Sequence, residues 1–318
     1  MDATIQSAPA QVAEPAAIVA ALKTNAGNPK GVRASFAKGQ CVLGRFTSAR
    51  EAASVTKSKS FTAPSKVLGR FSVGGGNPKV ADSNRVVLRG LSLHIGNGKD
   101  ATDMLFENAP VHFAKSTGQM LEFLTVRAPG PDGKPDAQKV KAFSAANPET
   151  LNQANYVAGK PVPGSFAGVT YFGIHAFPVT NARGLTRFVK FELIPAGGEI
   201  SLSDEEAKTK ADDFLQQDLK ARIVGGGIKF RMVALLDQPG DPTMDVTLRW
   251  PGEDDRQQVT LGTIELNALS DNEPCDETIF NPGTLAAGVA EPPDEIFAAR
   301  KLAYAISLAR RRSEIAQP

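Results

Sequence analysis

The sequence has few of the residues that most often hold metal ions or cross-link a fold. Its 318 residues include only two cysteines and three histidines. Cys41 and Cys275 are too few for a disulfide framework and lack the spacing of a zinc site. A single disulfide between them is one option, and two separate thiols in a reducing compartment are the option we favour. The histidines form no HxxxH or HExxH arrangement, which argues against a dedicated zinc or non-haem iron site.

Long apolar runs and a strong charge of either sign are also absent. No apolar stretch approaches the roughly 20 residues of a membrane span, and a formal net charge of +2 does not favour nucleic acid or an anionic membrane surface as a partner. Residues 1–14 lack the basic start and apolar core of a secretory signal. We therefore expect a cytoplasmic protein, although a periplasmic protein whose signal has been removed also fits. The sequence leaves a homo-oligomer open.

Short segments rich in branched and aromatic residues recur along the chain, with glycine, proline and asparagine between them. They predict strands at residues 42–46, 66–72, 86–95, 104–107, 169–177, 185–194, 228–236, 246–250 and 258–266. Apolar spacing and capping signals predict helices at residues 12–24, 117–126, 137–158 with an interruption at Pro148, 203–223 and 294–312.

This order of elements predicts the α+β class, with an antiparallel β-barrel core and with inserted and C-terminal helices. No internal repeat and no proline- or glycine-rich linker divides the chain. We expect residues 1–27 to form an N-terminal arm and helix, and residues 28–318 to form a single domain.

The sharpest local signal is the pair Arg300 and Tyr304 near the C-terminus. On a helix these residues lie one turn apart on one face, and Arg311 follows on the same side. A guanidinium beside a phenol favours the phenolate, and a phenolate can bind ferric iron as an axial ligand. Taken alone, however, Arg-x-x-x-Tyr is more often a surface arginine stacked on a half-buried tyrosine.

Several blocks, in a fixed order, resemble the catalase family. Residues 33–39 and 44–46 are similar to its signature Arg-x-x-His-Ala-Lys-Gly…Gly-x-Phe. The other matching blocks are residues 70–72 with Asp82 and 89–90, residues 108–111, residues 175–177 with Asn181 and Gly184, and residues 294–304. The resemblance runs from about residue 28 to 312 and fits the short catalase-related peroxidases best, which lack the extra C-terminal domain of large catalases.

The resemblance implies haem b as the cofactor, with Tyr304 as the ligand of its iron. It implies that Arg300 stabilises the Tyr304 phenolate. His175 and Asp294 resemble the residues behind that arginine, which fix its orientation through charged hydrogen bonds. By itself, His175 would more often be a core histidine with satisfied hydrogen bonds.

The resemblance also implies roles around the rest of the haem. Arg33, Arg70 and Arg311 match residues that pair with the haem propionates, for which a guanidinium has suitable geometry. Ser72 and Asn108 match polar residues on the distal side, where peroxide binds. Without that context, Asn108 would usually be a turn residue.

The pattern breaks at the distal histidine, which should lie three residues after Arg33. This chain has Phe36 there. In catalases the imidazole moves a proton between the two peroxide oxygens, and such acid–base catalysis contributes roughly 10²–10⁴-fold in rate. His112 stands where catalases usually carry an apolar aromatic residue. Our hypothesis is that His112 approaches the distal face and partly replaces the missing base; the alternative is that it only packs or hydrogen-bonds elsewhere.

The function that these residues favour is a haem peroxidase that consumes hydrogen peroxide or small organic hydroperoxides, with weak catalase activity. The first alternative is a non-catalytic haem protein, which Phe36 favours and the retained polar and proximal residues disfavour. The second is a haem isomerase of fatty hydroperoxides, a substrate that an apolar distal pocket would suit.

Overall fold

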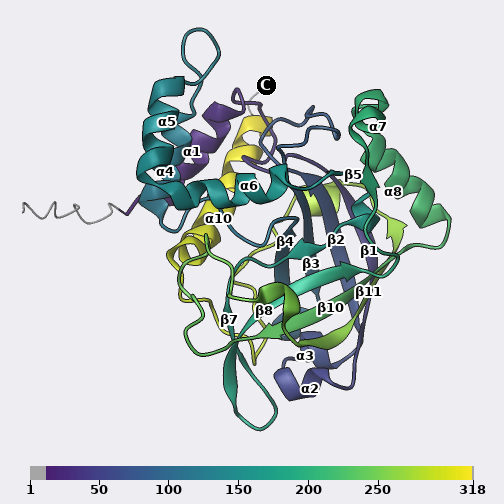
Figure 1. The fold of residues 1–318 in the computed structure, drawn as a ribbon. Coiled ribbons are helices and arrows are strands. Elements are labelled where there is room, and N and C mark those ends of the chain that lie inside the picture. Colours follow the sequence, from purple (N-terminus) through teal and green to yellow (C-terminus); the bar gives the residue numbers. More distant parts are fainter. Residues whose placement is uncertain (1–11, 317–318) are drawn as a thin grey trace, which may run out of the picture.

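The computed structural model describes residues 12–316, and its centre is a closed barrel of antiparallel strands (Figure 1). The strands are β1 (Lys38–Ser48), β2 (Ser65–Val73), β3 (Arg89–Ile95), β4 (Thr102–Glu107), β5 (Val162–Pro163), β6 (Tyr171–Phe172), β7 (Phe177–Thr180), β8 (Thr186–Pro195), β9 (Ser201–Leu202), β10 (Ile228–Leu236) and β11 (Gln258–Leu269). The nine-stranded sheet has the order β10-β11-β1-β2-β3-β4-β6-β8-β7, and the pairing of β10 with β8 closes it. The predicted α+β fold with an antiparallel barrel is confirmed.

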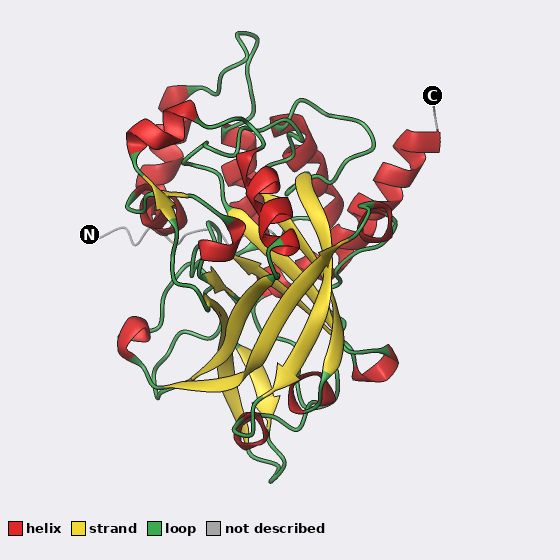
Figure 2. Cartoon of the chain, turned by 90° about the vertical axis from the view of Figure 1, so that its right-hand side faces the viewer, coloured by secondary structure: helices red, strands yellow, loops and turns green. Residues whose placement is uncertain are grey.

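Most of the helices lie at one end and along one side of the barrel, and two short ones lie at its other end (Figures 1 and 2). They are α1 (Pro15–Asn25), α2 (Ala52–Val55), α3 (Lys59–Thr62), α4 (Thr117–Val126), α5 (Ala137–Ala146), α6 (Asn152–Ala158), α7 (Asp204–Thr209), α8 (Phe214–Val224), α9 (Glu273–Asp276) and α10 (Glu295–Ala316). The C-terminal helix α10 packs against α1 and α4 beside the barrel. None of the helices within residues 12–316 combines the length and the apolar character that crossing a membrane requires.

Neighbouring residues of β2, β3 and β4 point to opposite faces of the barrel wall. Phe71, Leu91 and Phe106 are cross-strand partners and belong to the buried core inside the barrel. The next residue of β2 is Ser72, and the next residue of β4 is Glu107. Because side chains alternate, these two residues lie on the other face of the same wall.

Three predicted elements differ from the structure. The helix predicted at residues 203–223 is two helices, because the chain is extended at Lys210 and the carbonyl of Asp212 accepts a hydrogen bond from Lys38. Its capping box is present, with Ser203 accepting from the nitrogen of Glu206. The strand predicted at residues 169–177 is reduced to β6 and the start of β7.

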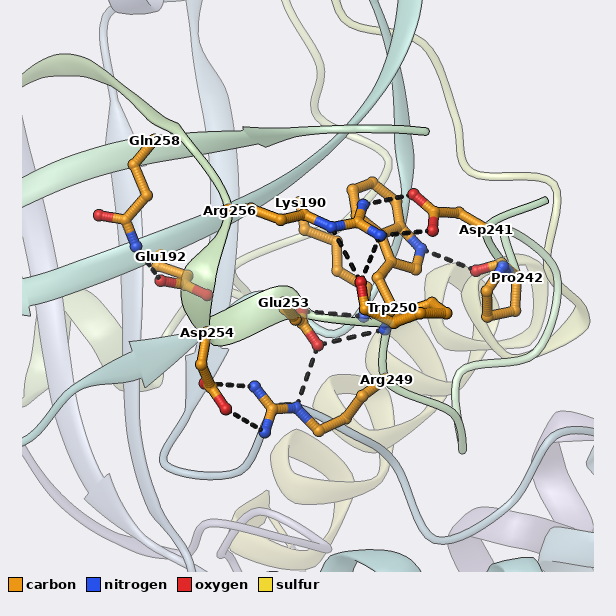
Figure 3. A network of polar contacts seen from close by, with 11 residues as sticks. Lys190, Glu192, Asp241, Pro242, Arg249, Trp250, Glu253, Asp254, Arg256 and Gln258 are labelled. Carbon is orange, nitrogen blue, oxygen red and sulfur yellow. Dashed lines mark hydrogen bonds and ion pairs between the residues drawn. The ribbon is translucent and has the colours of Figure 1, made fainter. Parts of the chain in front are cut away.

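The third difference is at residues 246–250, which form turns and not a strand. This segment is held on β8 by side chains instead of by a ladder of backbone bonds (Figure 3). Glu253 accepts from Lys190 at 3.2 Å and from Arg249 at 3.1 Å, and Arg249 also pairs with Asp254 at 2.5 Å. The Lys190 ammonium lies 5.3 Å from the centre of the Trp250 ring. The hydrogen bonds of these side chains replace those of a strand.

Cys41 of β1 and Cys275 of α9 form a disulfide across 234 residues of sequence, and both are fully buried. The prediction of two separate thiols is therefore wrong. The pairing follows from the tertiary fold, because the segment around α9 crosses β1 on the outside of the barrel: Asn272 accepts a hydrogen bond from the nitrogen of Cys41 at 2.8 Å. The disulfide fastens this segment to the barrel next to the cavity described below.

Candidate active site

A cavity lies between the outer face of β2, β3 and β4 and the helix α10. Its empty space is about 910 Å³ when its open mouth is included. Of the site residues that the sequence predicts, those that line it are Arg33, Phe36, Arg70, Ser72, Arg300, Tyr304 and Arg311. Residues from opposite ends of the chain therefore meet around one cavity.

One face of α10 supplies one wall of the cavity. Arg300, Tyr304, Ser307 and Arg311 follow each other at helical spacing and all line the cavity. The helix begins after Asp294, whose Oδ1 accepts a hydrogen bond from the nitrogen of residue 297 at 2.8 Å. A carboxylate in this position satisfies a backbone donor of the first turn, so the residue that starts the helix also fixes the position of the face.

A chain of hydrogen bonds connects Tyr304 to the buried Asp294. Arg300 donates through Nη2 to the Tyr304 hydroxyl oxygen at 2.9 Å, and its Nη1 lies 2.8 Å from Nε2 of His175. A guanidinium can only donate, so Nε2 accepts and the imidazole hydrogen is on Nδ1. That hydrogen is donated to Oδ2 of Asp294 at 2.8 Å. The structure thus joins four residues that the sequence placed in two separate blocks.

The charges along this chain are fixed by burial and by the neighbours. Burial lowers the pKa of His175, which keeps the imidazole neutral. Burial opposes the charged form of Asp294, but hydrogen bonds from His175 and from the backbone leave its pKa lowered. Burial likewise opposes the cation of Arg300, and its interactions with Tyr304, Glu107 and Asp294 more than compensate, so that its pKa is raised. An oriented guanidinium therefore remains charged beside the Tyr304 oxygen.

Three more guanidiniums, those of Arg33, Arg70 and Arg311, gather at the opposite end of the cavity. Burial, followed by repulsion from Arg33, lowers the pKa of Arg70 to about 9 and that of Arg311 to about 10. Asp276 is the carboxylate that pairs with Arg33. The buried Nε of Arg70 has no hydrogen-bond partner within residues 12–316. One carboxylate does not balance three cations, so this end suits a ligand with more than one anionic group.

This donor set fits a haem. The two propionates of a haem would meet the surplus of arginines, and a phenol oxygen held by Arg300 would face its iron. No group of three or more histidine, cysteine, aspartate or glutamate side chains is placed to hold a metal ion in the described part of the chain. The tyrosine is therefore the side chain through which the cavity itself would bind iron.

Phe36 lines the cavity in a strained conformation. Its φ of 51° lies in the left-handed region, which bulky residues rarely adopt. The backbone is held there by Arg70, which donates to the carbonyl of Phe36 at 2.9 Å. The ring lies over Gly90, where a Cβ atom would approach Phe36 to 2.9 Å and Ser72 to 2.8 Å. A side chain at position 90 would therefore collide with the Phe36 ring, so the ring can pack there only because residue 90 is glycine.

The structure does not bring Asn108 or His112 to the lining of this cavity. Oδ1 of Asn108 accepts a hydrogen bond from the nitrogen of Arg89 at 2.7 Å, and Asn108 lines a smaller, separate pocket. His112 stacks on Phe113, and its Nδ1 lies 2.9 Å from the carbonyl oxygen of Ala114. Burial lowers the pKa of His112 to about 4. The position of His112 therefore gives no support to a role as the distal base.

Glu107, which the sequence analysis did not single out, does line the cavity. It precedes Asn108 at the end of β4, and its Oε1 accepts a hydrogen bond from Gln153 at 2.8 Å. Burial, opposed by the charge of Arg300, raises its pKa to about 7. Its neighbour Asn108 does not line the cavity, so the end of β4 presents Glu107 to the site and turns Asn108 away from it.

Comparisons with known proteins point to one family. The family model described as catalase matches residues 29–315. A catalase-related peroxidase of Synechococcus elongatus is 34% identical over 302 residues, covering 93% of this chain and 88% of that protein. One of Mycolicibacterium paratuberculosis is 28% identical over 299 residues and covers 92% of each chain. The structure of catalase A from Saccharomyces cerevisiae aligns with a TM-score of 0.79 at 22% identity, covering 89% of this chain and 61% of the yeast chain.

Proposed function

The chain belongs to the catalase family, and we propose that it works as a haem b-dependent peroxidase on hydrogen peroxide or small organic hydroperoxides, with weak catalase activity. Membership of the family makes it an oxidoreductase that acts on peroxide. The dependence on haem, the range of substrates and the weak catalase activity are the proposal. We also propose that residues 28–318 act as a single haem domain, close to the 29–315 of the family match.

The observation that carries the proposal is the hydrogen-bonded chain from Tyr304 through Arg300 and His175 to Asp294. When bound, a haem supplies the redox chemistry that no side chain of the cavity has. Tyr304 would hold its iron, and the charge of Arg300 would favour the phenolate over the phenol. Asp294, on the far side of the imidazole, keeps the hydrogen of His175 on Nδ1, so that Arg300 always has an acceptor.

The weak catalase activity in the proposal follows from Phe36. Its ring cannot accept or donate a proton, and Ser72 beside it offers a hydroxyl that is a poor base. Catalase turnover needs proton transfer at two peroxide molecules and peroxidase turnover needs it at one, so the catalase reaction is slowed more. The phenyl ring also makes the distal wall apolar, which suits an organic hydroperoxide.

The disulfide bears on where the protein works. A buried disulfide between Cys41 and Cys275 is typical of proteins in an oxidising compartment. It favours the periplasmic location that the sequence left open over the cytoplasmic one. The proposed reaction is the same in either compartment.

The function is tested by loading the purified protein with ferric haem and mixing it rapidly with hydrogen peroxide. We expect a fast change of the haem spectrum, peroxide-dependent oxidation of a chromogenic phenol, and little release of oxygen. Tyr156 lies outside the cavity, so Tyr156→Phe is the matched control for any variant of Tyr304. A protein that keeps its haem but leaves the spectrum unchanged after peroxide would instead support the non-catalytic haem protein, the alternative that Phe36 favours.

A further inference from the structure

Among the residues that the structure describes, one carboxyl group lines the cavity, and it lies beside the position of the missing imidazole. The ionisable side chains that line the cavity are Arg33, Arg70, Glu107, Arg300, Tyr304 and Arg311. Arginines keep their protons at any ordinary pH, and the tyrosine is engaged by Arg300. Glu107 is therefore the side chain of the lining that can both take up and release a proton near neutral pH.

The register of the barrel places Glu107 on the peroxide side. Ser72 of β2 pairs with Gly90 of β3, and Gly90 pairs with Glu107 of β4, so the three form one row across the wall. Paired residues in adjacent strands lie about 4.5–5.5 Å apart and point the same way. The ring of Phe36 rests on Gly90, the middle of this row. The carboxyl is thus next to the ring that stands in place of the imidazole.

From this arrangement we infer that the Glu107 carboxyl is the acid–base group for peroxide cleavage, in place of the distal histidine. The inference rests on the proposed haem peroxidase function and names the residue that moves its protons. The nitrogen of Gln153 fixes one carboxyl oxygen, Oε1, and also donates to the carbonyl of Val111. Among the described residues no hydrogen bond engages Oε2, which leaves that oxygen for the substrate.

The proton balance is simple. The Glu107 carboxylate takes the proton from the inner oxygen of hydrogen peroxide and returns it to the outer oxygen. When the O–O bond breaks heterolytically, its electron pair stays with the outer oxygen, and the returned proton makes this oxygen leave as water. The two electrons that the inner oxygen then lacks would be supplied by the ferric haem of the proposed function, held by Tyr304. Glu107 ends in the protonation state in which it began.

The surroundings of Glu107 suit this task. Arg300 of α10 is the charged group that faces it and favours the carboxylate, whereas burial favours the neutral acid. The other elements packed against it contribute the uncharged residues Gln153 of α6, Gly90 of β3 and Phe172 of β6. The balance gives a pKa of about 7, and an acid–base catalyst works best when its pKa is close to the working pH.

The test uses Glu107→Gln in the haem-loaded protein, because the new amide oxygen still accepts the hydrogen bond from Gln153. We expect the rate of the peroxide reaction to fall roughly 10²-fold or more, the loss of a positioned acid–base group, with unchanged haem content. Glu107→Asp should recover part of the rate. The matched control is Glu192→Gln, since burial also raises the pKa of Glu192 to about 7 and Glu192 lies outside the cavity.

A second measurement does not depend on turnover. Fluoride binds ferric haem together with a proton, so its affinity should fall as pH rises through the pKa of the distal acid. We expect a break in this pH dependence in the wild type and in Glu192→Gln, and its loss in Glu107→Gln. The wild type can react with peroxide while Glu107→Gln keeps both its rate and its pH break. That result refutes the role of Glu107 and leaves the proposed function standing. A haem-loaded wild type that does not react overturns the proposed function and this inference with it.

Discussion

Asp294→Asn is the substitution that tests the proximal chain most directly, because it changes one atom of a buried carboxylate. The remaining oxygen still caps α10, since asparagine is as good a cap as aspartate. The new amide nitrogen then faces Nδ1 of His175 as a donor. The imidazole must move its hydrogen to Nε2, where it meets the donor Nη1 of Arg300. We expect two hydrogen bonds to be affected by this single change.

The size of the effect follows from the type of bond that is lost. A hydrogen bond to a charged group contributes about 1.5–3 kcal/mol, so the free energy of unfolding should fall by about 2–3 kcal/mol. At about 2 °C per kcal/mol for a chain of this size, the melting temperature should fall by about 4–6 °C. Asp294→Ala also removes the cap and should cost about 1 kcal/mol more.

The dependence on pH has a definite sign. The pKa of Asp294 is lowered in the folded protein from an ordinary value of 3.8, chiefly by His175 working against burial. Its contribution to stability is therefore complete above the unfolded pKa and is lost as pH falls through the folded pKa. The stability gap between wild type and Asp294→Asn should accordingly be constant at neutral pH and close in acid.

The measurement combines thermal unfolding with nitrogen-15 NMR of the histidines, of which the chain has three. We expect the nitrogen shifts of His175 to change from the Nδ1–H to the Nε2–H form. The control is Asp136→Asn, because Asp136 caps α5 at an exposed site with no histidine partner. An unchanged His175 spectrum, together with a melting temperature equal to that of the control, would refute the reasoning.

Three further outcomes are expected. Tyr304→Phe should retain little haem after gel filtration, whereas Tyr156→Phe should retain it fully; equal haem content in both would exclude Tyr304 as the iron ligand. Phe36→His should raise catalase activity by up to roughly 10²–10⁴-fold. Histidine tolerates the left-handed backbone of this position better than phenylalanine does. Unchanged oxygen release would show that Phe36 does not limit catalase activity. Cys41→Ser should lower the free energy of unfolding by about 5 kcal/mol, the chain-entropy value for a loop closed across 234 residues. It should also weaken haem retention, because Cys275 anchors the segment whose carbonyl groups bind Arg33 and Arg311. A denaturation curve equal to that of the wild type would contradict this.

Local signals were enough to predict that Arg300, Tyr304 and Arg311 share one face of a helix. Helical spacing put Arg300, Tyr304 and Arg311 on one face, and an aspartate before that helix is an ordinary capping signal. These relations depend on neighbours within a few turns, so the sequence contains them completely. The partnership with His175 was implied by the family resemblance, because no local rule links residues 119 positions apart.

Local signals failed where the outcome depends on packing between distant segments. The helix predicted at residues 203–223 breaks because Lys38 and Asp82 bind the backbone between its two halves. The disulfide between Cys41 and Cys275 was not predicted, since two isolated cysteines carry no information about their separation in the fold. In both cases the deciding partner lies more than a hundred residues away along the chain.

The sequence by itself determined most of the strand and helix pattern, the antiparallel barrel class and the face of α10 that carries Arg300, Tyr304 and Arg311. The tertiary structure alone decided which residue of the pair Glu107 and Asn108 reaches the cavity. Strand alternation assigns them to opposite sides, but both sides of this wall are packed, one against the barrel core and one against the helices. Only the pairing of Ser72, Gly90 and Glu107 across three strands settles the choice, and such register arises from contacts between strands and not within them.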